Sequence, residues 1–284
     1  MKNINLNQFA GNDASTLIKE ADKLFSKDLE GKLNAHKIYN VLLDEIPNIY
    51  DDKRLYVLRG FLRQKIWDCE RKFFWNEKFY SQSGQDKIIK NFFFPNKKHG
   101  FFVEVGAYNG IQGSNCFHFE KYLNWNGIAF EPSIIQFEKL KVNRNCLLIN
   151  KAIGPLEKEV EFIEVQEGLS QMSGINDENF IGKDIVTNDP KSKIVKSKIH
   201  TTTFEKNIQE NQEIDYLSVD IEGGEMELIE SIDFNKFSIK VISVENYPPE
   251  KQNFKKFFES KNFKYFERIG NDEIFYNCKF FNFN

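Results

Sequence analysis

The chain has 284 residues, of which 40% are hydrophobic and 29% are charged, a composition typical of globular proteins. Its 39 Lys and Arg residues against 42 Asp and Glu leave a formal net charge of −3, so there is no basic excess with which to hold nucleic acid. No stretch approaches the roughly 20 apolar residues that cross a bilayer, and the polar N-terminus lacks the apolar segment of a secretory signal. We therefore predict a soluble cytoplasmic protein with no membrane span and no nucleic-acid partner.

Cysteine usage agrees with a reducing compartment. The four cysteines, Cys69, Cys116, Cys146 and Cys278, lie too far apart in the sequence to form a CxxC redox or zinc motif. A chain of this size does not need a disulfide framework to be stable. We expect four free thiols.

Residues 1–78 are predicted to form a small, all-helical N-terminal region. Apolar residues recur at spacings of three and four within 17–25, 33–46 and 55–66, which is typical of one helix face each. These helices resemble one degenerate hairpin of the tetratricopeptide type, and a single repeat cannot bury its own faces. We expect either a cap on the rest of the chain or a surface for a partner or a second copy.

Residues 79–284 are predicted to form an α/β domain. Apolar strands alternate with amphipathic helices, which implies a parallel sheet covered on both faces. The expected strands are 101–105, 127–131, 146–153, 214–221 and 239–245, and the expected helices are 114–124, 133–142, 225–232 and 249–262. Residues 263–269 and 272–276 face each other across Gly270-Asn271, and this hairpin should add an antiparallel strand at the edge of the sheet.

The alternation breaks down between Glu167 and Lys198. This segment is rich in Gly, Ser and Asn, so we expect a long loop that acts as a lid over an acceptor pocket. Its five lysines make it locally basic and favour an anionic acceptor, such as a phosphorylated or nucleotide-linked sugar: Lys183, Lys191, Lys193, Lys196 and Lys198.

A glycine turn follows the first strand, in the segment Glu104-Val-Gly-Ala-Tyr-Asn-Gly110. Gly106 and Gly110 allow positive φ and close approach of a ligand to the backbone, at the crevice position of an open α/β sheet. The spacing GxxxG differs from the GxGxxG pattern of dinucleotide enzymes. Glu131 ends the second strand, where a carboxylate can accept hydrogen bonds from the ribose hydroxyls of a nucleoside cofactor.

A second group of candidate residues is acidic. Asp220 and Glu222 follow the fourth strand, and Glu245 ends the next one. Carboxylates at neighbouring strand ends raise each other's pKa, which is costly unless they act on a ligand. They could deprotonate a hydroxyl, with Asp220 first and Glu222 and Glu245 next, or hold a divalent cation. His118 is an alternative base.

A third motif, Tyr80-Ser-Gln-Ser-Gly-Gln-Asp86, comes just before the first strand. We expect the side chains of Gln85 and Asp86 to reach back over the cofactor site.

Together these segments resemble the FkbM-type S-adenosylmethionine-dependent methyltransferases. The motifs SQxGQD, FVEVGAxxGxxxS, FEP, NKAIG, SVDIEGGE, ISVEN and IGNDEIFY follow in the order of that family, from about Tyr80 to Tyr276. The resemblance implies a class I methyltransferase (Rossmann-like) sheet with one antiparallel strand, and O-methylation of a sugar, glycan or related metabolite. The implied cofactor residues are Glu104, Gly106, Ala107, Tyr108, Gly110, Ser114, Glu131, Pro132, Ala152, Asp220, Gln85 and Asp86.

Two other functions remain open at this point. An NAD(P)-dependent sugar-processing enzyme shares the order of strand, glycine turn and acidic residue, although the glycine spacing and the acidic group speak against it. A non-catalytic adaptor would use the N-terminal helices to bind a partner and keep the α/β domain as a scaffold.

Overall fold

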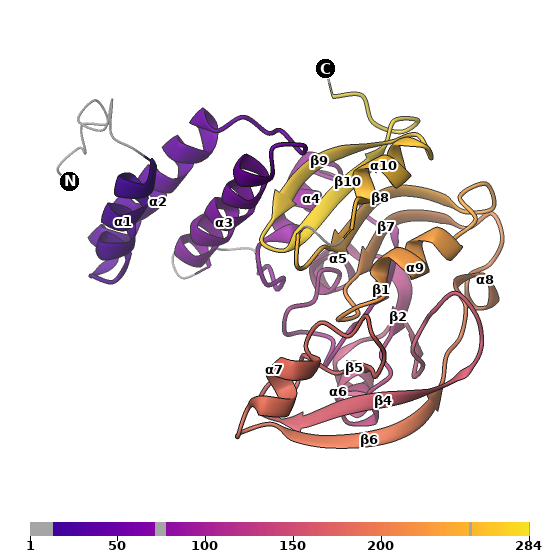
Figure 1. The fold of residues 1–284 in the computed structure, drawn as a ribbon. Helices are drawn as coiled ribbons and strands as arrows, with labels where there is room; N and C mark the ends of the chain where they lie inside the picture. The colour runs from indigo at the N-terminus through magenta and orange to yellow at the C-terminus, as the bar shows by residue number, and fades with distance from the viewer. Residues whose placement is uncertain (1–13, 72–77, 250–251, 284) are drawn as a thin grey trace.

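A seven-stranded sheet forms the centre of the computed structural model, which describes residues 14–71, 78–249 and 252–283 (Figure 1). The strand order is β3-β2-β1-β7-β8-β10-β9. Its strands are β1 (Phe101–Val105), β2 (Asn126–Phe130), β3 (Leu147–Ile149), β7 (Glu213–Val219), β8 (Ser238–Glu245), β9 (Phe263–Ile269) and β10 (Asp272–Asn277). The neighbours from β3 to β8 pair in parallel, whereas β10 is antiparallel to both β8 and β9. The prediction of a Rossmann-like sheet with one antiparallel strand is confirmed.

The antiparallel strand lies inside the sheet, so the prediction that it forms the edge was wrong. β10 inserts between β8 and β9, with Ile274 paired to Ser243 of β8 and to Glu267 of β9. Its side chains fill both faces, because Ile274 and Phe275 are fully buried in different core clusters. A strand buried on both faces belongs in the interior of a sheet.

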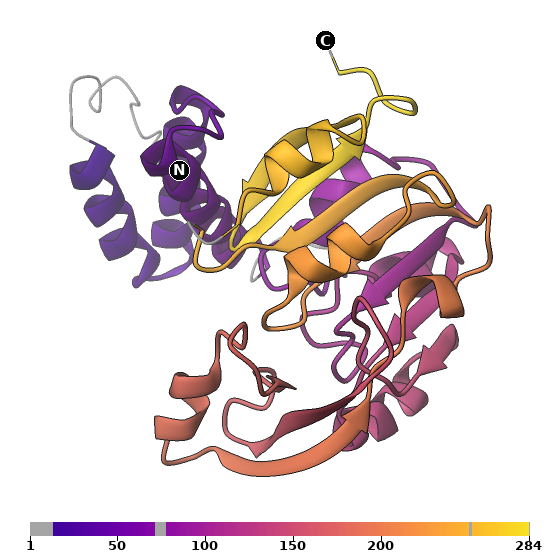
Figure 2. The same cartoon turned by 45° about the vertical axis from the view of Figure 1, so that its right-hand side comes forward.

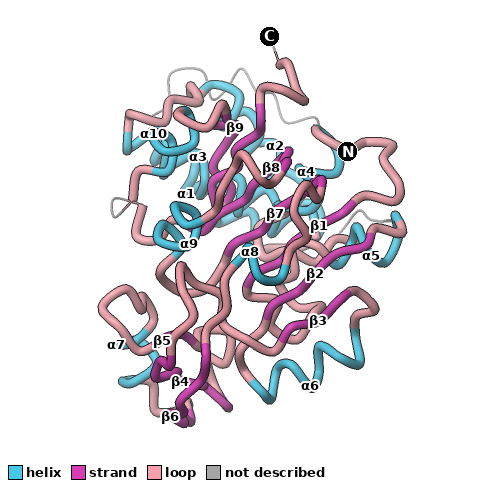
Figure 3. Tube along the Cα trace, turned by 90° about the vertical axis from the view of Figure 1, so that its right-hand side faces the viewer, coloured by secondary structure: helices cyan, strands magenta, loops and turns pink. Residues whose placement is uncertain are grey.

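Helices cover both faces of the sheet, as the alternation predicts. One face carries α4 (Gln85–Phe92), α5 (Phe117–Leu123) and α6 (Ile134–Asn143), and the other carries α8 (Phe204–Asn207), α9 (Glu225–Ser231) and α10 (Phe254–Glu259). Figure 3 shows α6 beside β3 at one end of the sheet and α10 near β9 at the other. Successive residues of β1 divide between the two layers, with Phe102 on the α5 side and Val103 on the α9 side.

Several elements are shorter than predicted, for local reasons. The helix expected from 114 begins at Phe117, because the Ser114 hydroxyl accepts the N–H groups of Cys116 and Phe117 in a preceding turn. The helix expected over 249–262 begins at Phe254, where Asn253 caps it by accepting from the Lys256 N–H; residues 250 and 251 lie outside the described part. The third strand ends at Ile149.

A second, three-stranded antiparallel sheet and a short helix interrupt the segment between Glu167 and Lys198, so the prediction of one continuous long loop was wrong (Figure 2). The order of this sheet is β5-β4-β6, with β4 (Glu159–Glu167), β5 (Gly174–Ile175) and β6 (Lys193–His200), and α7 (Lys183–Asn188) precedes β6. Three lysines of β6 are exposed strand residues that form ion pairs with glutamates of β4: Lys193 with Glu167, Lys196 with Glu161 and Lys198 with Glu159. Opposite charges on neighbouring strands add to the stability of their pairing.

Three helices precede the sheet: α1 (Ala14–Phe25), α2 (Leu29–Glu45) and α3 (Lys53–Glu70). They bury a core of their own, and α3 also lies beside β9 and β10 (Figure 1). Both Arg59 and Arg63 form ion pairs with Glu267 of β9. Residues 1–13 and 72–77 of the predicted N-terminal region lie outside the described part, and a partner for this surface stays a prediction.

Two further expectations concern the whole chain. All four cysteines are free, and Cys69 and Cys116 are buried. Within the described residues, no helix combines the length and the apolar composition needed to traverse a bilayer.

Candidate active site

The glycine turn after β1 is held between the ends of two neighbouring strands. Gly106 has φ of +88°, and a Cβ at this position would lie 1.7 Å from the backbone oxygen of Asp220, so only glycine fits. The N–H groups of Gly106 and Ala107 donate to the Phe130 carbonyl at the end of β2. The turn therefore lies at the crevice edge of the sheet, between β2 and β7.

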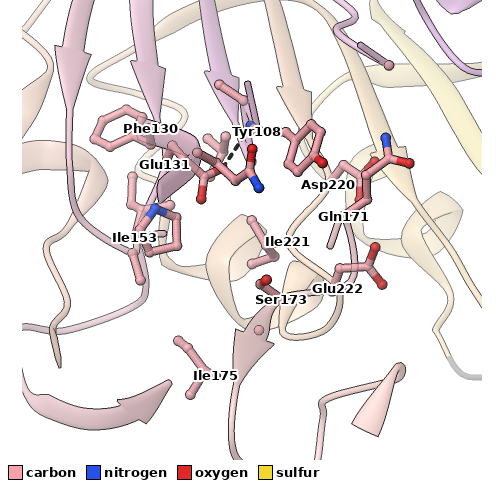
Figure 4. A pocket seen from close by; sticks show the side chains of 18 of the residues that line it. Tyr108, Phe130, Glu131, Ile153, Gln171, Ser173, Ile175, Asp220, Ile221 and Glu222 are labelled. Carbon is pink, nitrogen blue, oxygen red and sulfur yellow. Dashed lines mark hydrogen bonds between the residues drawn. The ribbon is translucent and has the colours of Figure 1, made fainter. Parts of the chain in front are cut away.

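Glu131 lies one strand away from this turn. Its Oε2 accepts a hydrogen bond from the Tyr108 N–H at 2.7 Å, and its Oε1 accepts from the Ser133 N–H at 2.8 Å. Burial raises its pKa to about 7. The two N–H donors partly oppose this by lowering the pKa, and the charge of Glu164 adds a smaller increase. The carboxylate is thus fixed in orientation and joined to the turn (Figure 4).

A pocket lies over the turn, and concave pockets of this kind are where small molecules and cofactors bind. Figure 4 shows Glu131 and Ile153 on one side of it and Gln171, Asp220 and Glu222 on the other. The second sheet lines the lower side of the pocket in this view through Gly174 and Ile175, with Ser173 just before β5 (Figure 4). The segment expected to be a lid therefore contributes to the wall; its movement as a lid stays a prediction.

The pocket brings together many of the residues singled out in the sequence. Those that line it are Gly106, Ala107, Tyr108, Ser114, Glu131, Pro132, Ala152, Asp220 and Glu222. Glu104, Gly110, Gln85, Asp86, Glu245 and His118 do not line this pocket.

Glu104 and Gly110 belong to the support of the turn. Glu104 lies on the α5 and α6 side of the sheet, where its Oε2 is 2.8 Å from Arg144 Nη1. The same Nη1 atom donates to the Gly110 carbonyl and the Ser114 hydroxyl, while Arg144 Nε pairs with Glu120 at 2.5 Å. A buried network of charges therefore holds both ends of the turn, and two of its members, Arg144 and Glu120, carried no signal in the sequence.

Asp86 and His118 lie away from the pocket. The Asp86 carboxylate accepts from the N–H groups of Tyr80 and Ser81, which closes the turn before α4. His118 is buried, its Nδ1 lies 2.9 Å from the Lys78 carbonyl, and its ring stacks on Phe79. Both positions are structural in this geometry.

Beside Asp220 lies a cluster of carboxyl groups from three segments: residues 220–225, the end of β8 and the start of β10. Burial, with Asp272 and Glu104 as further causes, raises the pKa of Asp220 to about 7. Burial and the charges of Asp220 and Glu225 raise the pKa of Glu222 to about 8. Burial likewise raises the pKa of Glu245 well above its ordinary value, and that of Asp272 to about 6. Several acids here exchange protons near neutral pH.

The comparisons with known proteins decide the family. The family described as "Methyltransferase FkbM domain" matches residues 104–269, which is more than half of the chain. The chain belongs to the FkbM methyltransferase family. The family resemblance stated from the motifs is therefore confirmed.

Solved structures resemble the FkbM chain only distantly. The methyltransferase FkbM from Methylobacillus flagellatus KT is 12% identical with a TM-score of 0.44, covering 84% of this chain and 57% of its own. A variant of MtNAS in complex with S-adenosylmethionine is 8% identical with a TM-score of 0.36, covering 93% and 97%. Coclaurine N-methyltransferase bound to N-methylheliamine and SAH is 10% identical with a TM-score of 0.29, covering 81% and 61%. No curated protein matches the chain.

The pocket of this FkbM domain fits the nucleoside half of a methyl donor. The turn at Gly106, a position with no room for a side chain, lies beside the fixed carboxylate of Glu131. Next to them, Phe130, Ala152 and Ile153 add apolar surface. Hydrogen bonds from two hydroxyls to one carboxylate and apolar contact with a flat ring are what a ribose and its base require.

The acidic residues around Asp220 do not fit a metal ion. Among the described residues, no group of three or more His, Cys, Asp or Glu side chains is arranged to hold one. Asp220, Glu222 and Glu245, which the sequence analysis considered as ligands, thus do not form a coordination site in this structure.

Some residues of the site carried no signal in the sequence. Gln171, Ser173 and Ile175 come from the segment interpreted as a loop, and Gln136 comes from the first turn of α6. Asn115 and Asp272 lie beside Asp220 in an adjoining pocket. Asp272 stands next to the turn of the predicted hairpin, and pairing of β10 with β8 places it opposite Glu245.

Proposed function

We propose that this chain transfers a methyl group from S-adenosylmethionine to a hydroxyl group of a sugar, glycan or related metabolite. The observation that carries the proposal is the position of Asp220. Its side chain lines the pocket over the glycine turn and also the two pockets that adjoin it. A carboxylate at such a junction can contact both a donor and an acceptor.

The donor supplies a methyl group on a positively charged sulfur, which leaves as a neutral thioether. Little negative charge develops on the leaving group, so the protein must mainly align the two reactants. In this proposal Glu131 accepts hydrogen bonds from the ribose hydroxyls. The turn at Gly106 and Ala107 supports the rest of the donor, and Ala152 and Ile153 lie against the base. Family membership and the pocket geometry both support this arrangement.

Asp220 is the proposed general base. A sugar hydroxyl is a weak nucleophile while it keeps its proton, so a nearby group must accept that proton. A pKa of about 7 leaves Asp220 partly ionised at neutral pH, which suits proton transfer at that pH. Glu222 lines the same pocket, and Glu245 lines the adjoining ones, so each is a candidate to share the proton.

The location and assembly of the protein also belong to the proposal. Four free cysteines support a reducing compartment such as the cytoplasm. The exposed surface of the N-terminal helices supports contact with a partner or with a second copy of the chain.

Calorimetric titration tests the cofactor. We expect S-adenosylhomocysteine to bind with micromolar affinity and NAD(P) to show no binding. Binding of NAD(P) alone would overturn the proposal in favour of a sugar dehydrogenase or a related enzyme. Transfer of a labelled methyl group to hydroxyl acceptors tests the reaction, and cofactor binding without any transfer would favour a non-catalytic adaptor.

A further inference from the structure

A second pocket adjoins the donor pocket and shares Asp220 with it. One wall comes from the ends of β8 and β10 through Glu245 and Asp272. The opposite wall comes from the N-terminal helices, because Val57, Phe61 and Gln64 of α3 line the same space. A molecule in this pocket would touch α3 and the candidate base together.

The α3 wall is firmly attached to the sheet. Its Gly60 carbonyl accepts a hydrogen bond from the Gly270 N–H at 3.1 Å, and a Cβ on Gly60 would lie 2.7 Å from the Gly270 oxygen. The ion pairs of Arg59 and Arg63 with the buried Glu267 flank this contact. Backbone contact and buried charge pairs fix the position of α3, so it forms a lasting part of the pocket.

The α3 wall presents apolar side chains to the pocket. Val57 is 42% exposed and Phe61 is 39% exposed, although both belong to a helix that packs its other face. The ammonium of Lys65 lies 5.2 Å from the Phe61 ring centre, but it is paired with Asp22 at 2.7 Å. An aromatic ring beside polar groups suits the apolar face of a sugar ring.

Asn115, which lines the same pocket, has a buried hydrogen-bond acceptor without a partner among the described residues. Asn115 is 6% exposed, and its Nδ2 donates to the Ser218 hydroxyl at 3.0 Å. Its Oδ1 has no hydrogen-bond partner among the described residues. A buried acceptor of this kind is costly unless a ligand supplies a donor, such as a hydroxyl or ammonium group.

The charge of the pocket disfavours an anion. Three carboxyl groups line it, those of Asp220, Glu245 and Asp272, against one guanidinium, that of Arg268. With pKa values of about 6 and about 7, Asp272 is mostly ionised and Asp220 partly ionised at neutral pH. The Arg268 guanidinium is already engaged by the Tyr56 hydroxyl and the Asn246 carbonyl, and it lies 3.9 Å from Glu273.

The lysines that favoured an anionic acceptor from sequence do not reach this space. None of the five lysines of the 167–198 segment is among the residues that line the second pocket.

We propose that this second pocket is the acceptor subsite, that α3 forms its recognition wall, and that it takes a neutral or amine-bearing sugar in preference to a phosphorylated one. The inference rests on the proposed methyl transfer, because it assigns the molecule that would meet the donor at Asp220. It also gives the N-terminal helices a part in substrate selection.

The test measures binding to the full chain saturated with S-adenosylhomocysteine. The probes are hexoses and methyl hexosides, their amino-sugar analogues and their phosphate esters, observed by saturation-transfer NMR and titrated where they bind. We expect at least one neutral or amine-bearing sugar to bind at least tenfold tighter than its phosphate ester. A preference for the phosphate ester, or no binding of any neutral or amine-bearing probe, would overturn the proposal.

Two α3 variants test the wall. Phe61→Ala should weaken the sugar at least fivefold and leave S-adenosylhomocysteine affinity unchanged, whereas Leu29→Ala, at a 54% exposed position of α2, should change neither. Val57→Lys adds a cation to the wall and should tighten the phosphate ester at least threefold. Unchanged sugar affinity in Phe61→Ala together with unchanged phosphate-ester affinity in Val57→Lys would exclude α3 from the subsite. If the unmodified chain does not bind S-adenosylhomocysteine, the proposed function itself would be contradicted.

Discussion

Gly106 packs directly against Asp220: a Cβ at position 106 would lie 1.7 Å from the Asp220 carbonyl oxygen. The Asp220 N–H also donates to the Val105 carbonyl at 3.0 Å, so the backbones of the two segments are joined where β1 and β7 end. The turn proposed to hold the donor and the proposed base therefore form one rigid unit. Their relative position follows from the pairing of two parallel strands.

Gly106→Ala should be strongly destabilising. The new Cβ would overlap a backbone oxygen that cannot move without breaking the pairing of β1 with β7, and alanine resists a φ of +88°. We expect a loss of at least about 2 kcal/mol in the free energy of unfolding, measured by urea denaturation. Gly154→Ala is the matched control, because no atom lies within 4 Å of its Cβ and its change should be near zero. Equal stability of the two variants would refute the close contact.

Glu131→Gln should weaken donor binding by about 1–3 kcal/mol, since it replaces a charged acceptor of hydrogen bonds with a neutral one. The pKa of about 7 makes donor affinity depend on pH. Below pH 7 the Glu131 carboxyl is mostly protonated, and it must lose its proton to accept hydrogen bonds from both ribose hydroxyls. Calorimetry should show S-adenosylhomocysteine affinity falling several-fold from pH 8 to pH 6 in the unmodified chain and staying flat in Glu131→Gln. Glu138→Gln, on the exposed side of α6, should behave like the unmodified chain. A variant with unchanged affinity would remove Glu131 from the ribose role.

Asp220→Asn should lower turnover by at least about 100-fold, the scale of general-base catalysis, while donor affinity changes little. If Asp220 is the base, turnover of the unmodified chain should also rise with pH through about 7 as its carboxyl ionises. Initial rates from pH 5.5 to 9 check both points, with Glu227→Gln at an exposed position of α9 as control. Turnover that survives the Asn substitution would place the base elsewhere.

The same substitution should make the protein more stable at high pH. The folded pKa of Asp220 is raised to about 7, whereas an unfolded Asp titrates near about 4. Between these values the folded state holds the extra proton, so the unfolding free energy falls as pH rises through this window. Asp220→Asn removes this cost, and we expect a gain on the order of 1–3 kcal/mol at pH 8 and almost none at pH 4. Denaturation curves at both pH values measure the difference, and a pH-independent effect would contradict it.

Arg144→Met should cost about 3–5 kcal/mol of stability, because it leaves two buried carboxylates without their partner. Arg144 is fully buried and pairs with both Glu104 and Glu120. Adding Glu104→Gln to the Met variant should recover part of the loss, since one unpaired charge is removed. Urea denaturation of the single and double variants tests this coupling. Strictly additive losses would show that the pair does not act as a unit.

Local patterns predicted the framework well. The strand at 101–105, the helix capped by Ser133 and the hairpin across Gly270 appear in the structure because each depends on neighbouring residues. The order of motifs was sufficient to identify the family. By contrast, β6 is mostly exposed, and only Ile194 and Ile199 are partly buried. It has no alternating apolar pattern that would predict a strand, and its pairing with β4 makes it one.

The amino-acid sequence by itself determined the alternation of strands and helices, the glycine turn and the carboxylate one strand over, because hydrophobic spacing and backbone freedom are local properties. Only the tertiary structure decided that β10 lies inside the sheet, that Glu104 forms a buried ion pair with Arg144, and that α3 faces Asp220 across a pocket. Those relationships join residues far apart in the chain. They arise from strand pairing, burial of charge and helix packing. These depend on the free energy of the whole fold and produce no local residue pattern that the sequence would show.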